Sequence, residues 1–179
     1  MKVYLENSTL GLLYEYENDD ISGALSDKEN NLNALIQILG LKFVQFFTSA
    51  DACSELERTC QSNPNRKDKL LKTFDKFKFI NLGHRARFGD RYRFGDHINF
   101  GPKYPKIQEK ISEFLQKESK SDTKEHYYDS MHLSNCYKTD IDYFLTIDSR
   151  TILEYKDKIK EIFGIKVVTP VELLNIINK

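Results

Sequence analysis

Four acidic residues stand at positions from which they can share one site. Glu6 closes the run KVYLE at residues 2–6, and Asp148 closes DYFLTID at residues 142–148; both runs are read as strands. Glu55 lies one turn into the helix expected after the strand FVQFFT, and Asp129 in the first turn of a helix expected over residues 125–138. Crowded carboxylates stay ionised only when a cation joins them. Oxygen ligands without His or Cys suit Mg²⁺ or Mn²⁺ and not zinc.

Each acid also has a simpler explanation. Glu55 can be surface charge, and Asp129 or Asp148 can cap a helix, because helix starts favour Asp for structural reasons. The positions of these residues in the sequence are compatible with a shared cation site and with these structural roles. If the cluster does bind a cation, it can hold a phosphodiester and deprotonate a water molecule for in-line attack.

The elements that must position these acids alternate between strand and helix. Apolar runs predict strands at residues 2–6, 43–48, 142–148 and 165–169, and helical spacing predicts the helices between them. Such alternation predicts an α/β fold, a three-layer α/β/α sandwich with a central parallel sheet of about four strands. Ligands in such sheets bind outside the carboxyl ends of the strands, where the four acids would meet. The acid-rich segment from residue 7 to about residue 31 is predicted to be a loose connection.

Length and charge limit the class of protein. The chain has 179 residues, which predicts a single domain over residues 1–179. Lys plus Arg and Asp plus Glu both number 27, so bulk charge cannot hold nucleic acid, although a local basic patch can. The start MKVYLE has no apolar signal core, and polar residues break the longest apolar stretch. We therefore expect a cytoplasmic protein that does not enter a membrane.

Residues 79–105 differ from the rest of the chain. They hold four of the eight glycines and repeat a six-residue pattern in RFGDRY, RFGDHI and NFGPKY. A basic helix is expected before them, from Asn63 to about residue 78. One reading is an ordered insertion that packs its aromatic side chains on the domain. The other is a flap over an RNA groove that binds phosphates and stacks bases; its candidate residues are Arg85, Arg87, Arg91, Arg93 and Tyr92.

Three stretches resemble the PIN domain, the family that includes the VapC toxin nucleases. They are KVYLENSTL, FFTSADACSELE and YYDSMHLSNCYKTDIDYFLTIDSRTIL, and the tail GIKVVTPVELL is also typical of the family. Together they cover most of the chain except residues 79–120. The resemblance implies a ribonuclease that depends on Mg²⁺ or Mn²⁺, with RNA as substrate. It also raises an antitoxin protein and a second copy of the chain as partners. Its catalytic and metal-binding acids would be Glu6, Glu55, Asp129 and Asp148.

The resemblance also suggests supporting residues. Asn7 and Ser49 match the small polar positions that follow or end the first two strands, and Thr146 is expected to hydrogen-bond a cluster carboxylate. Asp142 fits an Asp that the family has before its third strand, but its place at a strand start argues for loop bonding. His132 is predicted to be a packed helix residue and not a metal ligand, since no zinc spacing surrounds it.

Glu6 departs from the family pattern, which has Asp at this position. The extra methylene moves the carboxylate, and a metal site tolerates such misplacement poorly: an error of about 1 Å can cost about 10²-fold in rate. The alternative function is therefore a PIN-like module with weak or lost activity that binds RNA or a protein.

Overall fold

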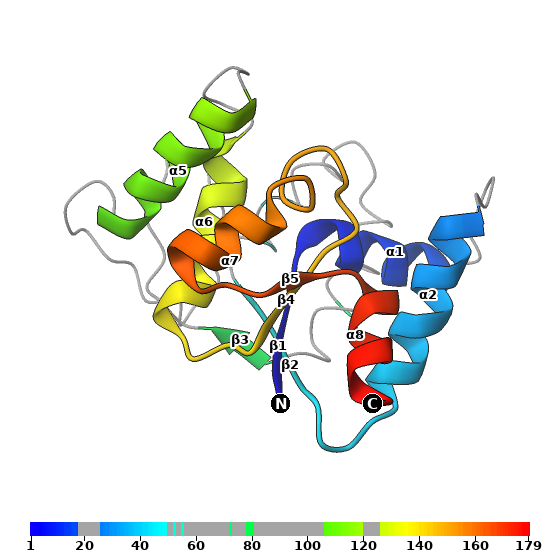
Figure 1. Cartoon of the computed structure of the whole chain (residues 1–179). Helices are drawn as coiled ribbons and strands as arrows, with labels where there is room; N and C mark the ends of the chain where they lie inside the picture. Colours follow the sequence, from blue (N-terminus) through cyan, green and yellow to red (C-terminus); the bar gives the residue numbers. More distant parts are fainter. Residues whose placement is uncertain are drawn as a thin grey trace.

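A parallel five-stranded sheet forms the centre of the molecule (Figure 1). The computed structural model describes residues 1–17, 26–49, 52, 55, 72, 78–80, 106–119 and 126–179. The strands run in the order β3-β2-β1-β4-β5, and every pair is parallel. Their bounds are β1 Lys2–Leu5, β2 Gln45–Ser49, β3 Lys78–Ile80, β4 Tyr143–Leu145 and β5 Val167–Val168. The first strand of the chain is thus the middle strand of the sheet.

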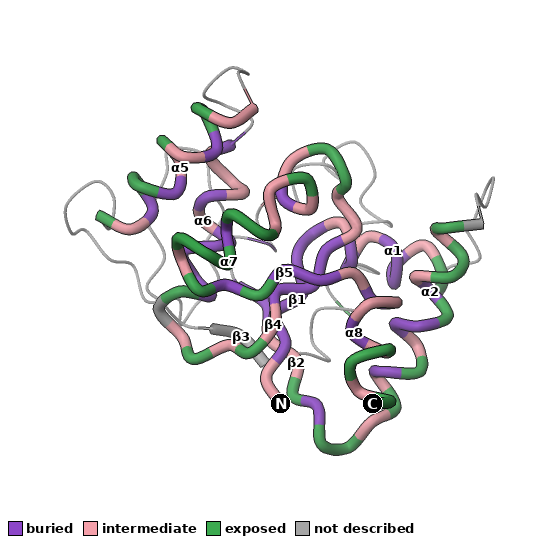
Figure 2. Tube along the Cα trace, in the orientation of Figure 1, coloured by how far each residue is buried: buried purple, intermediate pink, exposed green. Residues whose placement is uncertain are grey.

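Alternating side chains of β1 separate two cores. Val3 and Leu5 are buried in one core with residues of α1 (Asn7–Glu17), α2 (Ser26–Leu39) and α8 (Pro170–Ile177). Tyr4 is buried in the other, with residues of α5 (Lys106–Ser119), α6 (His126–Lys138) and α7 (Lys156–Phe163). Successive strand residues point to opposite faces, so helices cover the sheet on both sides. Figure 2 shows the buried strands between the two helix layers. The predicted α/β class with a parallel central sheet is confirmed.

The helix ends near the C-terminus follow the sequence signals. Gly164 ends α7 in the left-handed conformation, with φ of 71°, which favours glycine. Thr169 and Glu172 form a capping box at the start of α8, with Pro170 in its first turn. The two caps thus define where the chain leaves α7 and where it enters α8, on either side of β5.

Two predictions about the elements are wrong. Residues 7–17 form the helix α1 and not a loose connection; burial of Leu10, Leu13 and Tyr14 stabilises it despite Gly11 in its middle. Residues 78–80 form β3, which pairs with β2, where the basic helix was expected to end and the flap to begin. The sheet therefore has one strand more than the four predicted. The remainder of the proposed flap, residues 81–105, lies outside the described residues.

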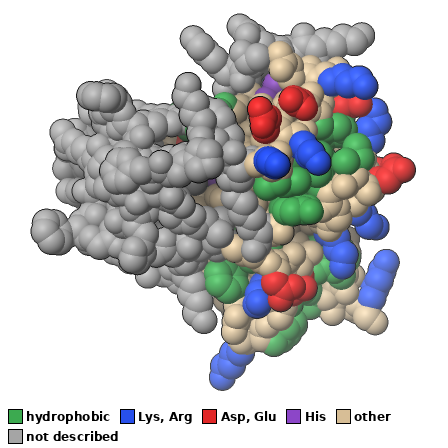
Figure 3. Space-filling model, turned by 90° about the vertical axis from the view of Figure 1, so that its left-hand side faces the viewer, with side chains coloured by type: hydrophobic (Ala, Val, Ile, Leu, Met, Phe, Trp, Pro, Cys, Tyr) green, Lys and Arg blue, Asp and Glu red, His purple; other side chains and the backbone are tan. Residues whose placement is uncertain are grey.

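Charge is mixed on the surface. On the described part of the face drawn in Figure 3, acidic and basic side chains alternate with apolar ones and do not separate into areas of one sign. Among the helices of the described residues, none combines the length and the apolar character needed to cross a bilayer.

Candidate acidic site at the carboxyl edge of the sheet

Glu6 joins the end of β1 to the start of α1. Its backbone oxygen accepts hydrogen bonds from the amides of Thr9 and Leu10, at 3.1 and 3.0 Å. Its buried carboxylate accepts three more on Oε2: from the amide of Ser8 at 2.9 Å, from the Ser8 hydroxyl, and from the hydroxyl of Thr146 at 2.9 Å. Thr146 directly follows β4. Its hydrogen bond to Glu6 confirms the predicted bond between Thr146 and a cluster carboxylate.

Glu55 is held by donors from two other elements. Its Oε2 accepts hydrogen bonds from Nδ2 of Asn7 and from Nε2 of His132, the latter at 3.1 Å. Asn7 is 8% exposed, and its buried Oδ1 has no hydrogen-bond partner among the described residues. A buried carbonyl oxygen without a donor is unfavourable, so a ligand that accepts electron pairs is expected beside it. Asn7 directly follows Glu6 in the sequence, and its Nδ2 donates to Glu55.

Asp129 and Asp148 approach the same edge from α6 and from the loop after β4. Oδ1 of Asp148 accepts from the amide of Arg150, and its Oδ2 from the hydroxyl of Thr151, both at 2.9 Å. The Asp148 amide donates to Oγ1 of Thr146 at 3.0 Å. Thr151 also lowers the pKa of Asp129, which lies in the first turn of α6 as predicted. The Asp148 side chain thus closes a turn and does not cap a helix, because α7 begins only at Lys156.

The acids are close enough to affect one another's ionisation. The pKa of Asp129 is raised from 3.8 to about 7, mainly by burial and also by the charges of Glu6 and Asp148, while Thr151 and His132 oppose the shift. Burial also raises the pKa of Glu6, although His132, Ser8 and Thr146 oppose it. These shifts are typical of carboxylates that share a desolvated site without a cation. Glu6, Asp129 and Asp148 therefore lie on one side of the sheet edge, and Glu55 joins them through Asn7 and His132.

The carboxylates do not yet form a set of metal ligands. Within the described ranges, no three His, Cys, Asp or Glu side chains are grouped so that they could hold one metal ion. Protein donors already bind both oxygens of Asp148, and three of them bind Oε2 of Glu6. A cation would have to draw these side chains together.

Asp142 lies away from this site. It is exposed at the start of β4, where its Oδ2 accepts a hydrogen bond from the amide of Lys2 at 2.7 Å. The expected loop bonding is thus confirmed, and a supporting role for Asp142 in the acidic site is wrong, because the amino end of a parallel strand lies at the opposite edge of the sheet. The five proposed RNA-binding residues of the flap, Arg85, Arg87, Arg91, Arg93 and Tyr92, lie outside the described residues.

His132 is the site residue that the sequence analysis undervalued. It is 1% exposed, as predicted for a packed residue, but both ring nitrogens are engaged. Nε2 lies 3.1 Å from Oε2 of Glu55, and Nδ1 lies 2.7 Å from the Tyr4 hydroxyl. The signal was its spacing of three residues from Asp129, which places both side chains on one face of α6.

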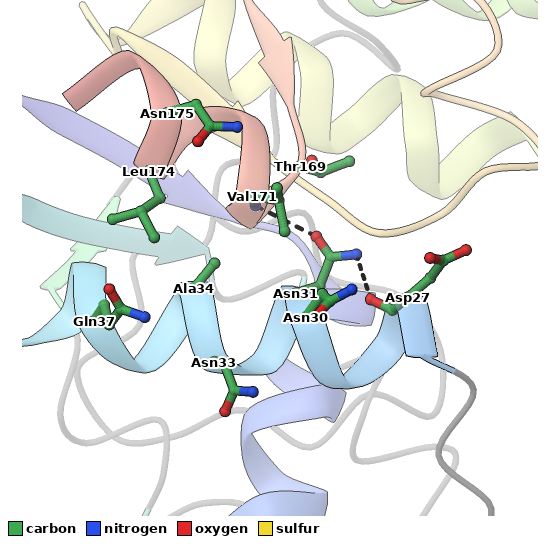
Figure 4. Close-up of a pocket in the computed structure, with 10 residues that line it drawn as sticks. All are labelled: Asp27, Asn30, Asn31, Asn33, Ala34, Gln37, Thr169, Val171, Leu174 and Asn175. Carbon is green, nitrogen blue, oxygen red and sulfur yellow. Dashed lines mark hydrogen bonds between the residues drawn. The ribbon is translucent and has the colours of Figure 1, made fainter. Parts of the chain in front are cut away.

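A separate cavity of about 440 Å³ lies between α2 and α8 (Figure 4). Half of the described residues that line it carry amide side chains, and Asp27 is the only ionisable residue among them. Asn31 joins the two helices there: its Nδ2 donates to the Asp27 carbonyl at 2.9 Å, and its Oδ1 accepts from the Val171 amide at 3.4 Å. A pair such as His132 and Glu55 is not found among these described lining residues, so the sheet edge is the better candidate for a catalytic site.

A scan against models of known protein families finds no match for this chain, and a comparison with curated proteins finds none either.

Proposed function

We propose that the chain is a PIN-like ribonuclease that uses Mg²⁺ or Mn²⁺ to hydrolyse RNA phosphodiesters. Two observations support the proposal: the charges of Glu6 and Asp148 raise the pKa of the largely buried Asp129, and the buried Oδ1 of Asn7, the residue after Glu6, has no hydrogen-bond partner among the described residues. This is an oxygen-rich site with excess negative charge, for which a hard divalent cation is the best match. The choice of RNA, with an antitoxin protein or a second copy as further partners, rests on the sequence resemblance.

The chain's own residues suggest how such a site would work. Oδ1 of Asn7 and the carboxylates of Glu6, Glu55 and Asp129 would hold the cation. A bound cation supplies an activated water and neutralises charge on the phosphate. Thr146 and Ser8 keep the Glu6 carboxylate at the end of β1, and Asn7 and His132 do the same for Glu55. Burial of the site limits competing water, which strengthens each electrostatic contact.

The test is cleavage of a single-stranded RNA with and without Mn²⁺. We expect cleavage that needs Mn²⁺ and stops with EDTA, and Asp129→Asn should lower the rate at least about 10²-fold, because it removes a cation ligand. Asp140→Asn is the matched control, since Asp140 is exposed and pairs with Lys2 at the opposite edge. Cleavage that survives both EDTA and Asp129→Asn would contradict the proposal.

The second candidate is a module that binds RNA or a protein without cutting. The observation in its favour is that three protein donors already saturate Oε2 of Glu6. Glu6→Asp separates the two functions. Under the nuclease proposal this variant preserves or raises cleavage. A wild-type protein that binds RNA in Mn²⁺ but never cuts it, before or after Glu6→Asp, would favour the module.

A further inference from the structure

A chain of hydrogen bonds crosses the interior and ends on Glu55. The Ala52 amide donates to Oγ of Ser49 at 3.2 Å, and Oγ of Ser49 lies 2.8 Å from the Tyr4 hydroxyl. The Tyr4 hydroxyl lies 2.7 Å from Nδ1 of His132, whose Nε2 lies 3.1 Å from Oε2 of Glu55. The chain thus connects β2, β1 and α6 with the helix that follows β2.

The positions of the protons in this chain of hydrogen bonds follow from its end at the Glu55 carboxylate. A carboxylate only accepts hydrogen bonds, so Nε2 of His132 carries a proton and donates to Glu55. In the neutral ring, Nδ1 then accepts the proton of the Tyr4 hydroxyl. Because that hydroxyl has one proton, Ser49 must donate to the Tyr4 oxygen. Every bond in the chain then points toward Glu55.

We infer that His132 is a positioning residue that fixes the orientation of the Glu55 carboxylate, an inference that rests on the proposed cation site. Two donors, Nε2 of His132 and Nδ2 of Asn7, converge on one oxygen, Oε2. No hydrogen bond of the described residues uses Oε1, so this oxygen is the one left for a cation. Groups that orient a ligand in this way typically change metal affinity about 10- to 100-fold when they are removed.

The geometry favours positioning over simple packing. A residue that only fills space in the core needs no polar partner, yet His132 has one at each ring nitrogen. Its ring is tilted against that of Tyr4, with ring centroids 5.9 Å apart. His132 is therefore fixed at both ring nitrogens, one of them on Glu55, without being one of the oxygen ligands.

The experiment measures Mn²⁺ affinity by calorimetry in four proteins. His132→Phe keeps a planar ring and removes both polar contacts, and we expect it to weaken Mn²⁺ binding about 10- to 100-fold. His132→Gln carries an N–H near the place of Nε2 and should recover most of that loss. Cys136→Ala is the matched control, because Cys136 is buried one turn further along α6 among apolar residues, and it should bind Mn²⁺ as the wild type does.

A measurement without metal supports the same test. The ¹⁵N resonances of the His132 ring should report a proton on Nε2, and Glu55→Gln should shift the Nε2 resonance. In the Glu55→Gln background, His132→Phe should weaken Mn²⁺ binding no further, because the two side chains act as one unit.

The outcomes separate this inference from the proposed function. A His132→Phe protein that folds and binds Mn²⁺ as tightly as the wild type overturns the inference, as does an Nε2 resonance that ignores Glu55→Gln. A wild-type protein that binds Mn²⁺ through this pair but never cuts RNA overturns only the nuclease proposal. If the wild type itself binds no Mn²⁺, both fail, and the failure is visible before any variant is made.

Discussion

The carboxylate of Asp129 should destabilise the protein when no cation is present. Its pKa of about 7 in the folded protein lies above the ordinary 3.8, so ionisation opposes folding. The cost is absent below about pH 4, grows as the pH rises towards 7, and stays constant above it. In EDTA at pH 8, Asp129→Asn should therefore raise the melting temperature by several degrees, since each pKa unit is worth about 1.4 kcal/mol. At pH 4 the two proteins should melt together.

At pH 8, Mn²⁺ should reverse the order of the melting temperatures of the wild type and the Asp129→Asn protein. A ligand that binds only the folded state stabilises it, so the wild type should gain and the Asp129→Asn protein should not. Equal melting temperatures of the two metal-free proteins at pH 8 would show that Asp129 is not crowded by Glu6 and Asp148.

For single residues, the sequence predicted positions better than contacts. Glu6, Asp129 and Thr146 could be placed because strand ends and helix starts have local signals. The contact between Asn7 and Glu55 could not be predicted, because 48 residues separate them and no local pattern fixes where an amide points. The burial of His132 was predicted, but its contacts were not, because its partners Tyr4 and Glu55 come from other elements.

At the scale of the elements, Glu172 links α7 to the cap of α8. Its carboxylate lies 2.5 Å from Nζ of Lys156 and accepts from the Thr169 amide at 2.9 Å. Burial raises its pKa, but Lys156 and Thr169 together outweigh burial and hold the pKa below 4.5. A lowered pKa contributes stability above the ordinary value, and that stability is lost as the pH falls through the folded pKa.

Glu172→Gln should thus lower the free energy of unfolding at pH 7 by about 0.5–1 kcal/mol, a small effect because the side chain is 40% exposed. The difference should shrink as the pH falls from 7 to 3, because protonation removes the carboxylate charge. Chemical denaturation at the two pH values measures it, with Glu161→Gln on the exposed side of α7 as the control. A difference of the same size at both pH values would show that the carboxylate charge is not its source.

The two faces of α8 should differ sharply in their tolerance of truncation. Leu173 is 0% exposed in the core under the sheet, whereas Ile176 is 41% exposed. Leu173→Ala should cost about 2–5 kcal/mol and Ile176→Ala within about 0.5 kcal/mol. Urea unfolding checks both values, and similar losses from the two variants would contradict the packing of α8.

The sequence predicted the elements with strong local signals. Periodicity and caps located α2, α5, α6 and α8. It missed α1, whose tyrosines and central glycine weaken the helical signal, and it missed β3, which has three residues and no room for a period. Tertiary packing decides both cases, and a window of sequence does not contain it.

At the scale of the whole molecule, the class could be predicted and the strand order could not. Alternation of strand and helix implies parallel pairing, because a parallel connection needs a crossover. The order β3-β2-β1-β4-β5 depends on which distant strands meet, such as Val3 with both Phe46 and Tyr143. The placement of Glu6 and Asp148 after two neighbouring strands at one edge is consistent with the class.

The central place of β1 has a consequence for the protein during its own synthesis. One neighbour of β1 begins at residue 45, but the other begins at residue 143, and two of the four acids come at residues 129 and 148. A nascent chain that still lacks β4 has one side of its middle strand unpaired and also lacks Asp148. Under the proposed function, the enzyme stays harmless to the ribosomal RNA beside it until Asp148 has left the ribosome.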